Sequence, residues 1–146
     1  MLGEASATAR LKHLNAAVER SKSDAFEKHW LILVEAERAT RAVAGAFCVF
    51  CKSGKDRTGM AVTLATAMLI RQPAAAAEGG PEEKVMLEHA NLLREHGARI
   101  RICLKNTGRK KYAFNVIQRE FLPYPYRPPM SCIEDLVSSI ANADTS

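Results

Sequence analysis

Long apolar runs are missing from this sequence, and none approaches the roughly 20 residues that span a bilayer. Residues 1–15, MLGEASATARLKHLN, also lack the basic stretch followed by an apolar stretch that marks a signal peptide. No internal repeat is present. We therefore expect a cytoplasmic chain that neither spans a membrane nor enters the secretory pathway.

Cysteine is scarce, with four in 146 residues: Cys48, Cys51, Cys103 and Cys132. Without a secretory context they are expected to be free thiols and not a disulfide framework. Cys48 and Cys51 form a C-x-x-C pair, but zinc would need two more ligands at workable spacing, which Cys103 and Cys132 do not supply. We expect no metal and no cofactor, and we place Cys48 in the core.

Acidic residues are absent from residues 99–111, while the whole chain carries a net charge of +5. That stretch holds six cations, which are Arg99, Arg101, Lys105, Arg109, Lys110 and Lys111. A cluster of one sign suits an anionic partner such as phosphate, nucleic acid or acidic lipid, or else forms a solvated surface. Composition alone leaves these alternatives open.

In other respects the composition is that of one globular domain. Hydrophobic residues make up 47% of the chain and charged residues 25%, which is ordinary for such a protein. The predicted domain is the single unit 1–146, with a core over about residues 24–130. A flexible break is expected at about residues 72–81 and a tail at residues 131–146.

Two apolar runs flank a polar loop. Ala42–Phe50, AVAGAFCVF, is short, continuous and rich in β-branched and aromatic residues, which predicts a buried strand. Thr58–Arg71 is apolar nearly all round, which predicts an enclosed helix. The fold class predicted is α/β, α-rich, with few strands. Because a buried strand needs neighbours and no second good strand is evident, either further strands escape detection or the chain is part of a larger domain.

Helical spacing and capping signals predict several other elements. Pro81 suits the first turn of a helix that ends before Gly97, and the basic stretch after Gly97 is expected to start extended. Further helices are expected at residues 4–20, 23–41 and 111–121, an extended proline-rich strap at residues 122–129, and a short helix beginning at Ser131.

The polar loop FCKSGKDRTGM holds the densest cluster of reactive groups. Cys51 is followed by five residues and then by Arg57 and Thr58. A free thiol has a pKa of about 8.5, and a helix N-terminus with nearby cations lowers it, so Cys51 can serve as a thiolate nucleophile. The N–H groups between Cys51 and Arg57 can form a nest around phosphoryl oxygens, with Gly54 permitting the tight turn.

Other side chains of the loop complete a phosphate site. Arg57 can grip two phosphoryl oxygens with its guanidinium fork, and Thr58 can donate its hydroxyl to the sulfur. Lys52 and Lys55 suit a second phosphate nearby, as on an inositol ring. Phosphate binding is therefore assigned to Lys52, Ser53, Gly54 and Lys55.

Asp56 is the expected general acid, which protonates the leaving alcohol. Its neighbours Lys55 and Arg57 favour the ionised carboxylate, which is a difficulty for that role. Asp24 is the alternative, with nothing in its surroundings to favour it. A nucleotide-binding P-loop is excluded, because Lys55 is followed by Asp56 where Ser or Thr is required.

The stretch CKSGKDRTGM resembles the active-site loop of the inositol polyphosphate 4-phosphatases, whose pattern is Cys-Lys-Ser-Ala-Lys-Asp-Arg-Thr. Glycine at position 54 is closer to bacterial secreted inositol phosphatase effectors. The segment Leu104–Pro129, LKNTGRKKYAFNVIQREFLPYPYRPP, favours the first family, because it is similar to the segment downstream of the loop in those enzymes. Members of the family are far longer than this chain.

The resemblance implies a cysteine-phosphatase-like core of strand, phosphate loop and helix within a partial catalytic domain. It implies removal of the 4-phosphate of phosphatidylinositol 3,4-bisphosphate, or of related inositol phosphates, through a cysteinyl-phosphate intermediate and without a metal. Carried over by position, Cys51 is the nucleophile and Arg57 the phosphate clamp. Myotubularins and Sac phosphatases also carry an acid just before this arginine, which supports Asp56 as the acid.

The expected partners are a phosphoinositide or inositol phosphate substrate and, peripherally, an acidic membrane surface, with no nucleic acid. Secondary anion contacts are expected at Lys105, Arg109, Lys110 and Lys111. Two alternatives stay open: a protein tyrosine or dual-specificity phosphatase, which the paired lysines disfavour, and an inactive phosphoinositide-binding fragment. The sequence does not indicate the oligomeric state.

Overall fold

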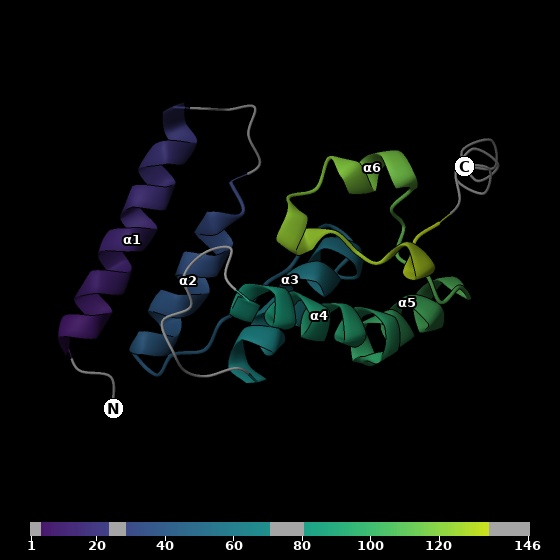
Figure 1. The fold of residues 1–146 in the computed structure, drawn as a ribbon, viewed down its shortest axis with the longest axis horizontal. Helices are drawn as coiled ribbons and strands as arrows, with labels where there is room; N and C mark the ends of the chain where they lie inside the picture. Colours follow the sequence, from purple (N-terminus) through teal and green to yellow (C-terminus); the bar gives the residue numbers. More distant parts are fainter. Residues whose placement is uncertain (1–3, 24–28, 71–80, 135–146) are drawn as a thin grey trace. The chain divides into compact units, whose positions relative to one another are not determined.

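A computed structural model describes residues 4–23, 29–70 and 81–134 of the chain (Figure 1). The density of internal contacts divides the chain into two compact units, residues 1–48 and residues 49–146. The single domain expected from composition therefore stays a prediction.

The first unit is a pair of helices, α1 (Glu4–Ser23) and α2 (Leu31–Ala42), which pack side by side (Figure 1). Ala17 of α1 and Ala39 of α2 are both buried, since small side chains allow helix backbones to approach closely. These helices confirm the helical character expected for residues 4–20 and for most of residues 23–41.

The boundary between these two helices differs from the prediction. Ser23 is the last residue of α1, where its hydroxyl donates a hydrogen bond to the carbonyl of Arg20 at 2.7 Å. It therefore ends one helix and does not cap the next. Residues 24–28, where the second helix was expected to start, and the alternative acid Asp24 with them, lie outside the described residues.

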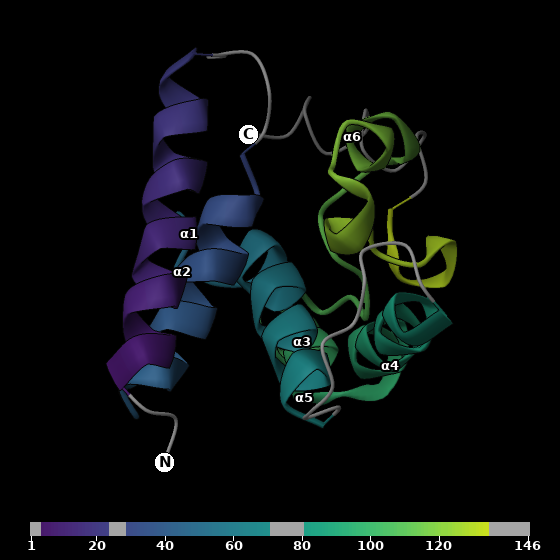
Figure 2. The same ribbon diagram turned by 60° about the vertical axis from the view of Figure 1, so that its left-hand side comes forward.

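The second unit is built around the helix that follows the polar loop. Its elements are α3 (Asp56–Ile70), α4 (Pro81–His96), α5 (Ala98–Thr107), α6 (Val116–Glu120) and the 3-10 turns η1 (Tyr124–Tyr126) and η2 (Met130–Cys132). Helix α3 packs against α4 and α5 (Figure 2), and Met60, Ala90 and Ile100 form part of the core. The helix expected at Thr58–Arg71 is confirmed as α3, although Leu69 and Ile70 at its end are exposed.

The predicted α/β fold class is wrong, because the described residues contain no strand and no sheet. In the segment expected as a strand, Ala42 ends α2, Ala44 adopts a positive φ of 54°, and residues 45–50 have no regular structure. Phe50 is 79% exposed. A strand is stable only when a neighbour satisfies its backbone groups, and the described part of the chain offers this segment no such neighbour.

The basic stretch after Gly97 is a helix, α5, and the expectation that it starts extended is wrong. The alternation Arg99-Ile100-Arg101-Ile102 imitates a strand. Ile100 and Cys103 stand three residues apart, however, and both are fully buried on one helical face. Arginine, leucine and lysine are also good helix formers. Packing of that face therefore decides the conformation.

The helix expected at residues 111–121 is present only as the short α6. Asn115 caps it through a capping box: its side chain accepts the N–H of Gln118 at 2.8 Å, and the side chain of Gln118 accepts the N–H of Asn115 at 3.2 Å. The residues before the cap pair with another segment instead. Tyr112 forms an isolated parallel bridge with Ile133, in which the N–H of Tyr112 donates to the carbonyl of Cys132 at 2.8 Å.

A buried arginine holds the proline-rich strap on the helices. Arg94 of α4 is 1% exposed, and desolvation by burial lowers its pKa to about 10. Its guanidinium donates to the carbonyls of Pro125 at 2.7 Å and of Arg127 at 3.0 Å, both in the strap, and to the hydroxyl of Thr63 in α3 at 3.1 Å. The strap expected to be extended is so only in part, because the 3-10 turn η1 interrupts it between Pro123 and Arg127.

The remaining predictions of organisation fall mostly outside the described residues. Of the expected break at residues 72–81, only Pro81 is described, and it begins α4 as predicted. Of the tail at residues 131–146, the structure describes residues 131–134. Across the described ranges, no helix has both the length and the hydropathy needed to traverse a bilayer.

Candidate active site

The loop Cys51–Lys55 turns sharply before α3. The N–H of Gly54 donates to the carbonyl of Cys51 at 3.1 Å, and the N–H of Gly59 donates to the carbonyl of Lys55 at 2.8 Å, the first bond of the helix. Gly54 has a φ of 66°, a left-handed conformation that glycine adopts without a Cβ clash. The expected loop that leads into a helix N-terminus is therefore present.

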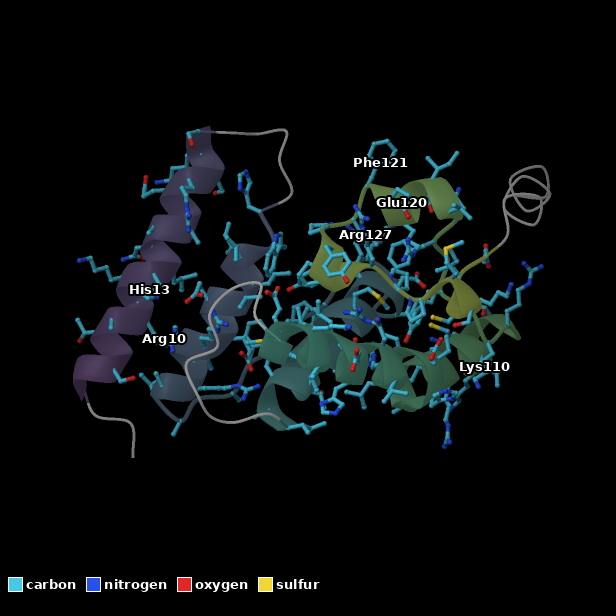
Figure 3. The ribbon with its side chains drawn as sticks, in the orientation of Figure 1. Arg10, His13, Lys110, Glu120, Phe121 and Arg127 are labelled. Atoms are coloured by element: carbon cyan, nitrogen blue, oxygen red, sulfur yellow. The ribbon has the colours of Figure 1, made fainter. Side chains whose placement is uncertain are left out.

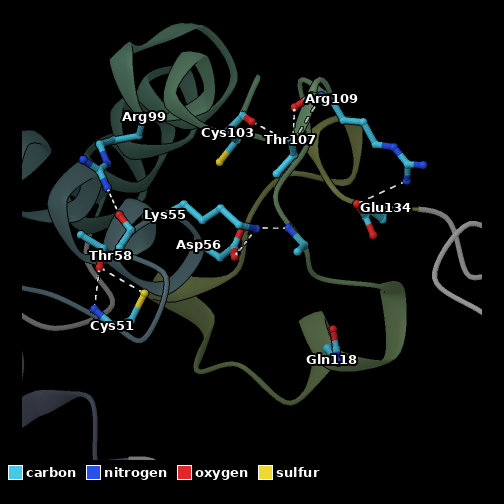
Figure 4. A network of polar contacts seen from close by, with 12 residues as sticks. Cys51, Lys55, Asp56, Thr58, Arg99, Cys103, Thr107, Arg109, Gln118 and Glu134 are labelled. Atoms are coloured by element: carbon cyan, nitrogen blue, oxygen red, sulfur yellow. Dashed lines mark hydrogen bonds and ion pairs between the residues drawn. The ribbon is translucent and has the colours of Figure 1, made fainter. Parts of the chain in front are cut away.

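Thr58 is bonded to Cys51 at two points (Figure 4). Its hydroxyl accepts the N–H of Cys51 at 2.9 Å and donates to the sulfur of Cys51 at 3.2 Å. Thr58 is 5% exposed, which limits the access of water to its hydroxyl. The sulfur is held at the start of α3, as the sequence predicted for a nucleophile served by this hydroxyl.

Cys51 has an acidic thiol. Desolvation by burial raises its pKa, but hydrogen bonds from the Thr58 hydroxyl and from the N–H groups of Thr58, Gly54 and Ser53 outweigh it and lower the pKa to about 6. These donors stabilise the thiolate because they are stronger with a charged acceptor. At neutral pH the sulfur is therefore mainly ionised.

Three loop residues remain available to a ligand. Lys52, Ser53 and Arg57 are exposed, and the structure shows no hydrogen bond or ion pair for the side chains of Lys52 and Arg57 within the described ranges. Arg57 directly precedes Thr58, so it stands one residue from the group that holds the sulfur. Both cations can rotate toward an anion without breaking an existing contact.

Asp56 joins the loop to a distant segment. Its Oδ2 accepts the Nζ of Lys55 at 2.8 Å, and its Oδ1 accepts the backbone N–H of Ala113 at 2.9 Å (Figure 4). Lys55 is therefore paired with Asp56 in this structure, and a phosphate that recruits Lys55 has to compete with that carboxylate.

Tyr112 packs against the same turn of α3. A Cβ placed on Gly59 would lie 2.9 Å from Cε1 of Tyr112, so the ring occupies the space that any other residue would fill. Tyr112 is fully buried, and its hydroxyl donates to the carbonyl of Arg94 at 3.1 Å. Tyr112 is therefore anchored in the core.

Arg99 of α5 also reaches the loop, and sequence reasoning did not assign it to the site. Its guanidinium donates a hydrogen bond to the carbonyl of Gly54 (Figure 4). Within the sequence Arg99 is one of six similar cations. The sequence could have indicated Arg99 only if this stretch had been predicted as a helix with Ile100 and Cys103 buried, because that prediction fixes the face on which Arg99 lies.

The expected secondary anion contacts differ among themselves. Arg109 forms an ion pair with Glu134, with 3.8 Å between Nη1 and Oε1. Lys105 is exposed on α5, and Lys110 lies just beyond the end of α5 (Figure 3). Lys111 is partly buried. Their role in binding anions stays a prediction.

The other three cysteines differ chemically from Cys51. Cys48 is exposed, so its expected place in the core is wrong. Cys103 and Cys132 are buried, and desolvation raises the pKa of both thiols, that of Cys132 to about 12. Over the described residues, no three His, Cys, Asp or Glu side chains converge as metal ligands.

Comparison with known proteins shows the family to which the chain belongs. Residues 2–126 match the family model described as INPP4A C-terminal domain. The chain belongs to the inositol polyphosphate 4-phosphatase family. The match includes the loop at Cys51, helix α5 and the segment at Ala113, and so confirms the resemblance drawn from the two sequence stretches.

Curated relatives of the 4-phosphatase family carry corresponding names. Human inositol polyphosphate 4-phosphatase type II is 34% identical over 121 residues, and the rat type II inositol 3,4-bisphosphate 4-phosphatase is 33% identical over 119 residues. These alignments cover 83% and 82% of this chain but 12% of each relative. The chain thus spans about an eighth of the length of the 4-phosphatases that it matches. No solved structure matches it.

Proposed function

We propose that this chain carries the phosphatase chemistry of its family and removes the 4-phosphate of phosphatidylinositol 3,4-bisphosphate or of related inositol phosphates. The observation that carries the proposal is the position of the Cys51 sulfur at the start of α3, where the Thr58 hydroxyl donates to it at 3.2 Å and donors of the loop lower its pKa to about 6. An ionised thiolate at neutral pH serves a nucleophile, while a merely structural cysteine gains nothing from it.

In the first step the Cys51 thiolate attacks phosphorus, forming an S–P bond as the P–O bond to the inositol ring breaks. The N–H groups that face the sulfur also face the transferring phosphoryl group, and Arg57 is free to turn onto its oxygens. Asp56 supplies the proton that the departing ring oxygen takes up.

In the second step water attacks the cysteinyl phosphate, forming a P–O bond as the S–P bond breaks and giving a proton to the Asp56 carboxylate. Inorganic phosphate leaves and the thiolate is restored. The Thr58 hydroxyl, 3.2 Å from the sulfur, donates to the thiolate as negative charge returns to it. No metal takes part in either step of the proposed reaction.

The loop has more cations than one phosphate group needs, and these extra cations favour a substrate with a second phosphate. Lys52 is exposed and unpaired within the described ranges, and Lys55 is paired only with Asp56. A second ring phosphate can engage Lys52 directly and can draw Lys55 away from Asp56.

Phosphate release across a panel of phosphoinositides, soluble inositol phosphates and phosphotyrosine peptides tests the proposal. We expect turnover of substrates with adjacent 3- and 4-phosphates, and none by Cys51→Ser, which should still bind the substrate. Cys48→Ser is the matched control, since Cys48 is an exposed thiol outside the loop, and it should retain full activity. Turnover by Cys51→Ser, or a preference for phosphotyrosine peptides, would contradict the proposed mechanism or substrate.

A further inference from the structure

Arg99 of helix α5 lies 45 residues after Gly54 in the chain and contacts the loop Cys51–Lys55. Its guanidinium donates to the carbonyl of Gly54, at the residue where the loop turns. The Nε of Arg99 is buried and has no hydrogen-bond partner among the described residues. The bond to Gly54 (Figure 4) therefore anchors a guanidinium that is partly shielded from solvent.

The carbonyl that Arg99 holds is one half of a peptide group. In a planar trans peptide, the C=O and the following N–H point in opposite directions. A cation that fixes the carbonyl of Gly54 on the α5 side therefore directs the N–H of Lys55 toward the other side of the loop. N–H groups that point to one side are what a nest needs to bind an oxyanion.

The Gly54 backbone needs such a contact because glycine is free to adopt several conformations. With a φ of 66° and no atoms within 4 Å of where its Cβ would stand, Gly54 has no side-chain contact to hold its carbonyl, and its N–H bonds within the loop, to the carbonyl of Cys51 at 3.1 Å. Its peptide can rotate more easily than that of any other residue type. An external hydrogen bond restricts that rotation before a ligand arrives.

We propose that Arg99 is a positioning residue of the phosphate loop, acting through the carbonyl of Gly54 to orient the N–H of Lys55 toward the bound oxyanion. This inference rests on the proposed function of the loop. It gives Arg99 a role separate from the chemistry of the sulfur, because Thr58, Gly54 and Ser53 set the pKa of Cys51 and Arg99 is not among those groups.

The same helix provides a matched control. Arg101 is exposed, and the structure shows no hydrogen bond or ion pair for it within the described ranges. Arg101→Gln removes the same charge from α5 and leaves the Gly54 contact intact. A general loss of positive potential should affect Arg99→Gln and Arg101→Gln alike, whereas loss of the hydrogen bond should affect Arg99→Gln alone.

The test measures how well tungstate, a tetrahedral oxyanion, protects Cys51 from alkylation by iodoacetamide in the whole 146-residue chain. For Arg99→Gln we expect the half-protecting tungstate concentration to rise roughly tenfold, the value of one charge-assisted hydrogen bond. Arg99→Lys, which keeps a donor, should recover part of the loss, and Arg101→Gln should stay near wild type. The pH midpoint of alkylation should stay near 6 in all of them.

Each other outcome has a definite meaning. Unchanged protection in Arg99→Gln, an equal loss in Arg101→Gln, or a shifted pH midpoint in Arg99→Gln would overturn the positioning role. Protection of the wild-type protein without any phosphatase turnover would overturn the proposed hydrolysis and leave the role of Arg99 standing. No protection of the wild-type protein would overturn the oxyanion site, and the role of Arg99 with it.

Discussion

Thr58 accepts a hydrogen bond from the backbone N–H of Cys51 and donates one to its sulfur, at 2.9 Å and 3.2 Å. One hydroxyl thus positions the thiol and is one of the donors that lower its pKa. The arrangement is local, because seven residues separate the partners and the helix start lies between them. It makes the acidity of Cys51 a property that a single side chain can change.

Thr58→Val should raise the pKa of Cys51, because valine keeps the shape of threonine and lacks the hydroxyl. Since the thiolate forms as pH rises through this pKa, the midpoint of iodoacetamide alkylation should move up from about 6, on the order of one pH unit for one lost bond to a charged sulfur. Thr58→Ser, which keeps the hydroxyl, should leave the midpoint near that of wild type. A midpoint unchanged in Thr58→Val would show that the backbone donors alone hold the thiolate.

Asp56→Asn should separate the two tasks of this carboxyl group. Asparagine can still accept the N–H of Ala113 but cannot donate the proton, so we expect turnover of inositol substrates to fall about 10²- to 10⁴-fold while the fold persists. Turnover of an activated aryl phosphate, whose leaving group needs no proton, should change little. Equal losses on both kinds of substrate would assign the proton to another group.

Asp56→Ala supplies the comparison for the tie to Ala113. It removes the acceptor of the Ala113 N–H as well as the proton, so it should lower the free energy of unfolding by about 1 kcal/mol relative to Asp56→Asn. Urea denaturation followed by circular dichroism measures this difference. Identical unfolding curves for the two variants would mean that the bond to Ala113 does not stabilise the fold.

Arg94→Met should destabilise the second unit strongly. The change leaves the carbonyls of Pro125 and Arg127 without their buried donor, and we expect a loss of about 3 kcal/mol in the free energy of unfolding. The matched control is Arg101→Met, an exposed arginine of α5, which should change stability by less than about 0.5 kcal/mol. A loss of similar size in both variants would show that the contacts with the strap do not explain the destabilisation.

Gly59→Ala should destabilise α3 although alanine is the better helix former by about 1 kcal/mol. The new Cβ would meet the ring of Tyr112 at 2.9 Å, and overpacking of this kind costs about 1–3 kcal/mol. Tyr112→Leu combined with Gly59→Ala tests the cause, since removal of the ring should abolish the added cost in a double-mutant cycle. Additive losses would show that the contact is not responsible.

Local sequence was enough to locate the candidate site. Cys51, Gly54 and Thr58 lie within eight residues, and the helix that begins at Asp56 follows from the apolar pattern that succeeds it. The proline at its first turn likewise placed the start of α4. Such features are predictable because their partners stand a few residues apart.

Pattern was misleading where one run of residues suits two conformations. The run Ala42–Phe50 reads as a buried strand, yet without a neighbouring strand among the described residues it has no regular structure. The alternation around Ile100 reads as a strand as well, and burial of Ile100 with Cys103 makes it a helix. The pattern of side chains favours one secondary structure, but that structure forms only where the backbone and side chains find suitable neighbours.

By itself, the sequence determined the reactive loop, its family and the helix that follows the loop. Only the tertiary structure brought Arg99 to Gly54 across 45 residues and Ala113 to Asp56 across 57. These contacts depend on how α3, α5 and the segment after α5 pack together, and no local periodicity encodes that packing. The loop carries its own acidic thiol, but Arg99 and Ala113, which bond to its backbone and to Asp56, meet it only in the folded chain.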